Sequence, residues 1–450
     1  MSRPRIVVIA TVHWAATTRL CLEMADRGFE VRALTPADHA LFKMCAVTVD
    51  RLGRTRAEAL ETIRRVVERY SPDLLIPGDD PAIELLRTLH NRAVRGRGRK
   101  PDQMAALIEA SLGAPSSFVF AYQKSRFVSL AREEGLSAPR TQVVRDLHQL
   151  RAHIATARFP LVIKRDEMYG GQGVRIVATA AEAEQAFLEF RTTVGRVFAL
   201  RQAVRRLDLG HLRQLCRARP AITVQEYIEG RPANRAVVCH RGRVLAGLSV
   251  EALRTSACTG PATVVRVIDS PAMADATARL VHRLGLSGFV GFDFMLEAGT
   301  GRPYLLEMNQ RPTQICHLVF NASSDMIGAL ATALPAAVDR RATPNIGSGT
   351  VALFPQESWR DPASDFLRTA HHDVPWQEPE FIVAYREPVA AEPLSWVQIA
   401  RQFLRNPRRH LGRRTEVAPL STANNLSGST SAFASSAYAE ALPGKDAIHV

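Results

Sequence analysis

Acidic side chains interrupt an otherwise apolar stretch between residues 288 and 311. Its composition is typical of two strands joined around a Gly-Thr-Gly loop, which predicts a β-hairpin. With Ala298 placed opposite Arg302 at the loop, counting back along both strands sets Asp293 directly opposite Glu307. Directly opposed residues share one face of the sheet, with Cβ atoms about 5 Å apart. The spacing therefore predicts two carboxylates side by side.

Asn309 adds a third oxygen donor, because it follows Glu307 by two residues and strand side chains alternate between faces. Two carboxylates forced together repel and raise a pKa unless a cation neutralises them. Mg²⁺ prefers such oxygen ligands, and phosphate oxygens can complete its shell. We therefore predict a metal site formed by Asp293, Glu307 and Asn309, with Mg²⁺ or Mn²⁺ as the ion. The alternative is a hairpin whose polar face meets only water.

Such a site needs a scaffold, and the first 115 or so residues alternate between segments that suit buried strands and segments of helical periodicity. This alternation predicts a parallel sheet covered by helices. The first turn lacks the glycines that a dinucleotide pyrophosphate requires, so no dinucleotide site is expected. The expected elements are the strand Arg5–Ala10, the helix Thr17–Arg27, the strand Glu30–Leu34, the helix Arg56–Tyr70 and the strand Asp73–Pro77.

Ligands of open parallel sheets bind at the carboxyl ends of the strands. His13 follows the first strand, and Asp79 and Asp80 follow the strand that ends at Pro77. These residues are therefore candidate contacts to a substrate. Capping of the next helix by Asp80 is an equally good interpretation.

A further segment suits phosphate binding. The apolar strand Phe159–Lys164 ends in a lysine and precedes Gly170, Gly171 and Gly173, which lead into the strand Val174–Ala178. This order is a hairpin, so neither of the common strand–loop–helix nucleotide motifs applies. A glycine-rich hairpin tip can still donate N–H groups to phosphates while a lysine supplies positive charge. By itself, the pattern is equally typical of an ordinary turn.

The segment Ile222–Gly230 is expected to be an apolar strand that ends in acidic residues. Backbone N–H and C=O groups at such an edge can hydrogen-bond an adenine. The carboxylate of Glu226 or Glu229 can accept from the adenine amino group or from a ribose hydroxyl. The simpler interpretation is the end of a surface strand.

Composition excludes several other classes of protein. The 450-residue chain carries a net charge of +14, but its basic residues lack the aromatic interleaving of nucleic-acid-binding surfaces, so no nucleic-acid partner is expected. Six cysteines without a CxxC pair favour a reducing compartment, which we take to be the cytoplasm. The apolar runs are too short for a membrane span.

Taken in order, these segments resemble the ATP-grasp superfamily over roughly residues 120–320. The final Asn-x-Arg is closer to the biotin-carboxylase and carbamoyl-phosphate-synthase branch than to the D-alanine ligases. The resemblance implies an α/β and α+β fold, in which a Rossmann-like pre-ATP-grasp domain precedes the ATP-grasp fold. The matching motifs are AYQKSRF around Lys124, the strand FPLVIK, the glycine-rich GGQGVRIV, the segment VQEYIEG, and the two hairpin strands GFDFMLE and LLEMNQRP.

The resemblance also implies roles for individual residues. Lys124 and Lys164 would contact the phosphates of ATP, under a mobile lid formed by Gly170, Gly171 and Gly173. Arg311 would steady an acyl-phosphate intermediate, with Arg266 sharing that task and Lys164 assisting catalysis. The segment after Gly230 lacks the acid that often contacts ribose in this family, so the resemblance leaves that contact to Glu229. The residues implied in adenosine binding are Gln225, Glu226, Tyr227, Ile228 and Glu229.

We therefore predict an ADP-forming ligase that activates a carboxylate as an acyl phosphate for attack by an amine or a thiol, with ATP and Mg²⁺ or Mn²⁺ as cofactors. The expected partners are small-molecule carboxylates and amines. The alternatives are a bicarbonate-activating enzyme and a non-catalytic ATP-binding regulatory protein. The expected domains are residues 1–115, an ATP-grasp domain at 116–340 with a lid near 155–228, a C-terminal region at 341–414 and a disordered tail at 415–450.

Two segments lack an assigned role. The Arg-rich insertion Arg191–Arg219 is long for the family, and it suits either an anionic substrate or a solvated helical hairpin. The segment Ser395–Arg405 has the periodicity of a basic amphipathic helix. Such a helix docks on its own protein more often than on an anionic membrane surface or a partner.

Overall fold

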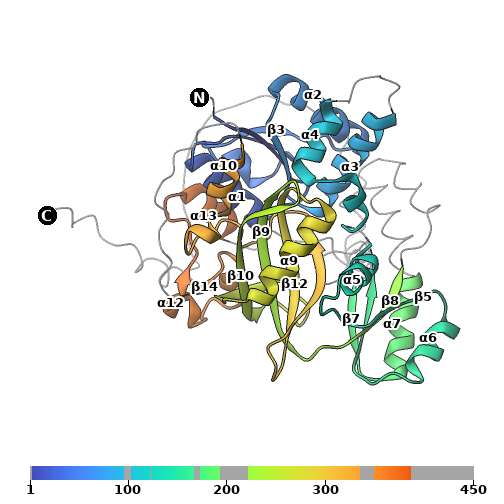
Figure 1. Ribbon diagram of the computed structural model, residues 1–450. Coiled ribbons are helices and arrows are strands. Elements are labelled where there is room, and N and C mark those ends of the chain that lie inside the picture. The colour runs from blue at the N-terminus through green and yellow to red at the C-terminus, as the bar shows by residue number, and fades with distance from the viewer. Residues whose placement is uncertain are drawn as a thin grey trace, which may run out of the picture. The chain divides into compact units, whose positions relative to one another are not determined.

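The computed structural model describes residues 3–95, 103–121, 123–166, 173–192, 221–334 and 349–386. Three sheets organise these residues (Figure 1). The N-terminal sheet has the strand order β3-β2-β1-β4, and all its pairs are parallel. This confirms the predicted parallel sheet. Its strands are β1 (Arg5–Ile9), β2 (Glu30–Thr35), β3 (Thr48–Arg51) and β4 (Leu74–Pro77), and its helices are α1 (Ala15–Asp26), α2 (Arg56–Tyr70), α3 (Asp80–Arg95) and α4 (Gln103–Leu112).

The central strand β1 is apolar on both faces of this sheet because helices cover both. Val7 and Ile9 belong to a core that includes residues of α2, α3 and α4. Ile6 and Val8 point to the other face and join a core that includes α1 and strands of a different sheet. Continuous apolar strands are the pattern expected of a buried parallel sheet.

The smallest unit is an antiparallel sheet in the order β5-β8-β6-β7. The helices α6 (Leu147–Ile154) and α7 (Ala180–Thr192) share a core with its strands. The helix α5 (Lys124–Glu133) contacts β5 and also β13 of the largest sheet, so it links the two. The strands are β5 (Thr141–Val144), β6 (Leu161–Arg165), β7 (Val174–Val177) and β8 (Ile222–Glu226).

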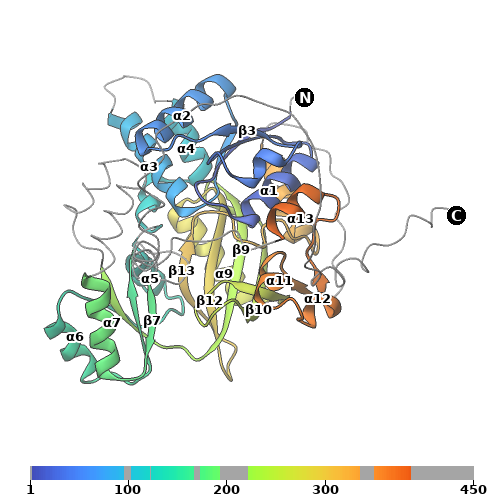
Figure 2. The same ribbon diagram turned by 180° about the vertical axis from the view of Figure 1, so that it is seen from behind.

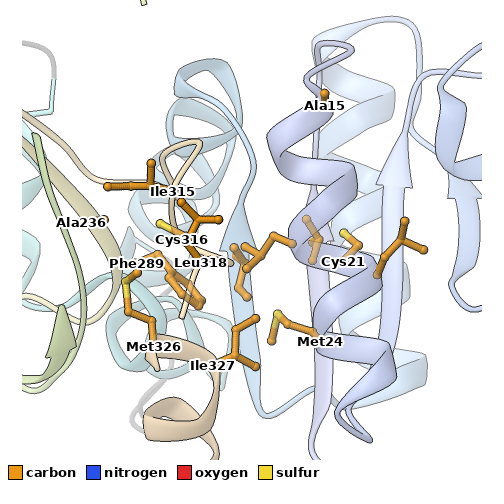
Figure 3. Close-up of a cluster of buried hydrophobic side chains, with 14 of the residues drawn as sticks. Ala15, Cys21, Met24, Ala236, Phe289, Ile315, Cys316, Leu318, Met326 and Ile327 are labelled. Atoms are coloured by element: carbon orange, nitrogen blue, oxygen red, sulfur yellow. The ribbon is translucent and has the colours of Figure 1, made fainter. Parts of the chain in front are cut away.

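The largest sheet has seven strands in the order β13-β12-β9-β10-β11-β14-β15. One face packs against α5 and α9 (Pro271–Leu284). The other face packs against α1 and α10 (Met326–Ala333), as Figure 3 shows for residues such as Met24, Phe289 and Met326. The strands are β9 (Gly230–His240), β10 (Arg243–Thr255), β11 (Ala262–Val267), β12 (Gly288–Glu297), β13 (Pro303–Asn309), β14 (Thr350–Ala352) and β15 (His371–His372).

The segment after residue 349 is built into this architecture. β14 pairs with β11 and so extends the largest sheet. The helix α13 (Pro379–Tyr385) lies beside α1 (Figure 2), where Thr18 Oγ1 and the Tyr385 hydroxyl are 2.8 Å apart. Two further short helices, α11 (Gln356–Arg360) and α12 (Phe366–Thr369), lie between these elements in the chain.

The predicted hairpin is present. Its strand register agrees with the prediction at Asp293 and Glu307 but differs from it beside the loop. Asp293 pairs with Glu307, as predicted. Ala298 does not face Arg302, because Arg302 accepts a backbone hydrogen bond from Glu297 instead. An irregularity between Asp293 and Phe294 shifts the pairing by one residue and restores the predicted partners. A β-bulge of this kind inserts one unpaired residue into one strand.

Other predicted boundaries shift by a few residues, and several predicted features lie outside the described residues. The expected strand from Ile222 to Gly230 is divided, because β8 ends at Glu226 and β9 begins at Gly230. No helix among the described residues has the length and apolar character needed to cross a membrane. Outside the described residues lie Gly170, Gly171, the insertion beyond Thr192, Ser395–Arg405 and the predicted tail.

Candidate active site

The predicted metal ligands lie together on one face of the largest sheet. Asp293 Oδ2 accepts a hydrogen bond of 2.8 Å from Asn309 Nδ2. Its other oxygen, Oδ1, accepts one of 2.6 Å from Asn234 Nδ2, on the neighbouring strand β9. Asn234 was missed in the sequence, because its proximity depends on the pairing of β9 with β12, two strands far apart in the chain. The arrangement fixes the orientation of the Asp293 carboxylate from both sides.

Two lysines face these carboxylates from other elements. Lys124 is the first residue of α5, and its Nζ lies 2.8 Å from Glu307 Oε2. Lys164 lies on β6, and it makes no ion pair within the described part of the chain. Burial lowers the pKa of Lys164, and the neighbouring Lys124 lowers it further against the opposing effect of Glu307. The site therefore combines a paired and an unpaired ammonium group beside two carboxylates.

The pKa values of the two carboxyl groups are shifted in opposite directions. Burial raises the pKa of Asp293 to about 7, and the negative charge of Glu307 adds to this effect. Burial also acts to raise the pKa of Glu307, but Lys124 and Lys164 outweigh it and lower that pKa to about 2. Two carboxylates that share a site raise the pKa of one of them, and a bound cation would relieve their mutual repulsion.

The donor set fits Mg²⁺ bound together with phosphates. Two carboxylates and the Asn309 amide oxygen are the hard ligands that Mg²⁺ accepts, and Mg²⁺ usually takes only one or two carboxylates from the protein. Among the described residues, no group of three or more His, Cys, Asp and Glu side chains forms an all-protein metal cage. The site therefore suits an ion that shares its shell with a phosphorylated ligand.

Arg311 is held rigidly next to this cluster. Its Nε donates a 3.0 Å hydrogen bond to Asp80 Oδ2, and its guanidinium carbon lies 4.3 Å from the centre of the Trp14 ring. Its Nη2 lies 3.4 Å from Asn309 Oδ1. Because Asp80 and Trp14 belong to the N-terminal region, Arg311 links the metal cluster to that region.

The predicted adenine-binding segment lines the same cavity. The described residues provide no hydrogen-bond partner for the backbone of Tyr227 or Ile228, so these groups are available to a ligand. Glu226 accepts a bond from the backbone N–H of Arg140, and Gln225 donates to Thr141 Oγ1. Both side chains are therefore already engaged in positioning β8 against β5.

A single cavity of about 970 Å³ joins these features. Its wall includes the hinge segment 225–228, both lysines, the metal cluster and Arg311. Gly173 and His13 also line it, whereas Glu229 does not. Pockets for small ligands of this size are common at the junctions of domains and sheets.

Three predicted contacts are placed elsewhere or have another task. Arg266 is paired with Glu251, which lies opposite Ala233 on the α5 and α9 side of the sheet, so the structure does not bring Arg266 to the cluster. Asp79 accepts from the backbone N–H of Ala82 and thereby caps α3, in place of the expected Asp80. Helix capping thus falls to Asp79, and ion pairing with Arg311 falls to Asp80.

Comparison with known proteins agrees with this geometry. A family model described as an ATP-grasp domain matches residues 202–314. The chain carries an ATP-grasp domain. That family is the one which the sequence motifs resemble, and the fold expected from it is confirmed.

Three solved structures with this fold are similar over most of the chain. One is the biotin carboxylase domain of 2-oxoglutarate carboxylase from Hydrogenobacter thermophilus, in complex with MgADP, ADP and bicarbonate (14% identity, 77% of this chain and 72% of that chain, TM-score 0.51). Another is the N5-carboxyaminoimidazole synthetase of Staphylococcus aureus with ADP (11% identity, 76% and 79%, TM-score 0.51). The third is a biotin carboxylase–β,γ-ATP complex from Campylobacter jejuni (15% identity, 74% and 72%, TM-score 0.50). At these identities the likeness concerns the fold.

Proposed function

We propose that this ATP-grasp protein is an ADP-forming ligase, which activates a carboxylate as an acyl phosphate and transfers the acyl group to an amine or a thiol. The observation that carries the proposal is the meeting of Asp293, Glu307 and Asn309 with Lys124 and Lys164 on one cavity. Phosphoryl transfer requires positioning and charge neutralisation more than covalent help from the protein. This cluster has the groups for both tasks.

The nucleotide would lie between the hinge and the metal cluster. The free backbone groups of Tyr227 and Ile228 would bind the adenine, beside the strand end that carries Gln225 and Glu226. Lys124 and Lys164 would contact the phosphates, and the glycines at 170, 171 and 173 would cover them. Glu229 lies off the cavity, which makes it a poor ribose contact.

Asp293, Glu307 and Asn309 would hold Mg²⁺, which supplies charge neutralisation at the phosphate oxygens when bound. Lys124 Nζ forms an ion pair of 2.8 Å with Glu307 Oε2, so in the nucleotide complex this ammonium group would contact both the carboxylate and a phosphate. The ion pair keeps the Lys124 ammonium oriented toward the place where phosphate binds. Lys164 has no such partner among the described residues and is free to meet phosphate directly.

The reaction would proceed in two displacements. A carboxylate oxygen attacks the γ-phosphorus, the bond from that phosphorus to ADP breaks, and an acyl phosphate forms. The amine then attacks the acyl carbon, inorganic phosphate leaves with the former carboxylate oxygen, and the nitrogen releases a proton to solvent. Arg311, held between Asp80 and Trp14, would stabilise the negative charge of the acyl phosphate.

Trapping of the acyl phosphate tests the proposal. With ATP, Mg²⁺, a panel of carboxylic acids and hydroxylamine as the amine, we expect a hydroxamate together with ADP and inorganic phosphate. Lys164→Met should abolish this product, while Lys43→Met, at an exposed position, should not. Formation of AMP and pyrophosphate would contradict the proposal, as would ADP release that requires bicarbonate and no organic acid. A cytoplasmic location stays a prediction.

A further inference from the structure

The helix α5 receives its N-terminal cap from a different element. Its own N-cap residue, Gln123, makes no side-chain capping bond. Asp166, which directly follows β6, provides the cap instead. Its Oδ1 accepts a 3.3 Å hydrogen bond from the backbone N–H of Ser125, and its Oδ2 accepts one of 2.7 Å from Ser125 Oγ. Ser125 is the second residue of α5, a position at which helix caps commonly act. The cap therefore joins the small sheet to α5.

Asp166 is itself anchored by the small sheet. Its backbone N–H donates to the carbonyl oxygen of Ala221 at 2.9 Å, directly before β8. The backbone N–H of Arg165 donates to the carbonyl oxygen of Gly173 at 2.9 Å, directly before β7. Asp166 and Ser125 are both buried, with exposed fractions of 4% and 8%. Water therefore competes little for the bonds between them, and the Asp166 side is fixed by backbone hydrogen bonds to both neighbouring strands.

This contact lies next to both predicted phosphate-binding lysines. Lys124 immediately precedes Ser125 as the first residue of α5, and its Nζ pairs with Glu307 of the metal cluster. Lys164 precedes Asp166 by two residues, a spacing that keeps two side chains on one side of an extended chain. Lys124, Ser125, Lys164 and Asp166 all line the cavity. The bonds between Asp166 and Ser125 therefore fix the distance between the two backbone segments that carry the lysines.

Electrostatics alone does not explain a carboxylate at this place. The negative charge of Asp166 would repel the phosphates that the two lysines attract. Burial lowers the pKa of Lys164, and of the carboxylates of Glu307, Asp293 and Asp166, which oppose this effect, Asp166 contributes least. A carboxylate at a helix N-terminus is stabilised by the helix dipole and by the N–H groups that it accepts from. The geometry therefore supports a capping role for Asp166 better than a role as a charge.

We infer that Asp166 is a positioning residue for nucleotide binding: through Ser125 it holds the first turn of α5 so that Lys124 and Lys164 meet the same phosphates. The inference rests on the proposed function, since it takes the phosphates of ATP as the ligand of the two lysines. Asp166 itself contacts neither the nucleotide nor the metal ion in this account. Its loss should therefore weaken the interactions with the phosphates and leave those with adenosine unchanged.

The test compares the binding of ADP and of adenosine to the full-length protein by titration calorimetry. Asp166→Ala should weaken ADP binding by about 10-fold or more and change adenosine binding by less than about 2-fold. Asp166→Asn, which keeps one acceptor for Ser125 Oγ, should retain part of the ADP affinity. Ser125→Ala should also weaken ADP binding, and its combination with Asp166→Ala should lose no more than Asp166→Ala alone, because both changes remove one contact. The matched control is Asp146→Ala, which removes an exposed cap of α6 (Asp146 accepts from the backbone N–H of Gln149 at 2.8 Å) and should leave both affinities unchanged.

Unchanged or tighter ADP binding by Asp166→Ala would overturn the inference, because the carboxylate would then do no more than repel phosphate. Equal losses for ADP and adenosine would also overturn it, since they would show a general structural role. A loss confined to solutions with Mg²⁺ would make Asp166 a metal ligand, and a loss confined to alkaline pH would mean that it only keeps Lys164 protonated; either result contradicts the positioning role. Wild-type protein that binds ADP no more tightly than adenosine would do so as well. The expected order of affinities without hydroxamate formation by the wild type would instead contradict the proposed ligase function alone.

Discussion

Replacement of Arg311 by methionine tests how the N-terminal region is coupled to the site. Arg311 and Asp80 form an ion pair of 3.0 Å, and each side chain is 11% exposed. Removal of one partner from a buried pair leaves the other charge uncompensated, which typically costs about 3–5 kcal/mol. We therefore expect Arg311→Met to lower the free energy of unfolding by an amount in that range.

A double-mutant cycle separates this structural cost from the chemical one. Asp80→Asn combined with Arg311→Met removes both charges, so its loss of stability should be smaller than the sum of the two single losses by about 0.5–3 kcal/mol. Urea-induced unfolding of the wild type and the three variants measures this difference. Hydroxamate formation, assayed where all four proteins are folded, should remain absent from the double variant despite its recovered stability.

Two results would refute this reasoning. Strictly additive losses of stability would mean that Asp80 and Arg311 do not support each other in the native protein. Recovery of hydroxamate formation in the double variant would mean that Arg311 acts only through stability and does not stabilise an acyl phosphate.

Further predictions concern the metal cluster and the strand beside it. Glu307→Gln and Asn309→Ala should each lower Mg²⁺-dependent ADP release by about 100-fold or more without unfolding the protein. The control Glu133→Gln, at an exposed position, should leave that rate unchanged. Near-wild-type rates in the first two variants would show that Glu307 and Asn309 do not bind the metal. Because the pKa of Asp293 is raised from 3.8 in the unfolded chain to about 7 in the native, metal-free protein, the native state binds a proton there that the unfolded state loses. The stability that this proton contributes is complete below pH 4 and disappears as the pH rises through 7. Urea unfolding of Asp293→Asn should therefore show a weaker pH dependence than the wild type over that interval. Gly230→Ala should cost about 1–3 kcal/mol, because an added Cβ would overlap the backbone carbonyl oxygen of Leu296; an unchanged urea midpoint would contradict that packing.

Local patterns were sufficient for much of the fold. The alternation in the first 115 residues predicts the parallel sheet, because buried strands and amphipathic helices have different periods. The pairing of Asp293 with Glu307 also follows from the hairpin spacing. That success depends partly on compensation, since the loop pairs Glu297 with Arg302 and a bulge then corrects the register. Neither irregularity has a clear signal in the amino-acid types.

Contacts between distant segments could not be predicted in this way. Asn234 reaches Asp293 across a strand pair, and Asp80 reaches Arg311 from the first turn of α3, so no local spacing encodes either contact. The neighbouring strands likewise decide the face on which Arg266 lies, because its pairing with Glu251 depends on how β10 and β11 align.

The central claim is that a carboxylate oxygen takes the γ-phosphoryl group of ATP. An accepted acid labelled with ¹⁸O at both carboxylate oxygens tests this claim directly, because the oxygen that attacks phosphorus leaves with inorganic phosphate when the amine displaces it. We predict one ¹⁸O atom in the phosphate released per turnover, measured by mass spectrometry, and none in ADP. Unlabelled phosphate, or ¹⁸O recovered in AMP, would contradict the account.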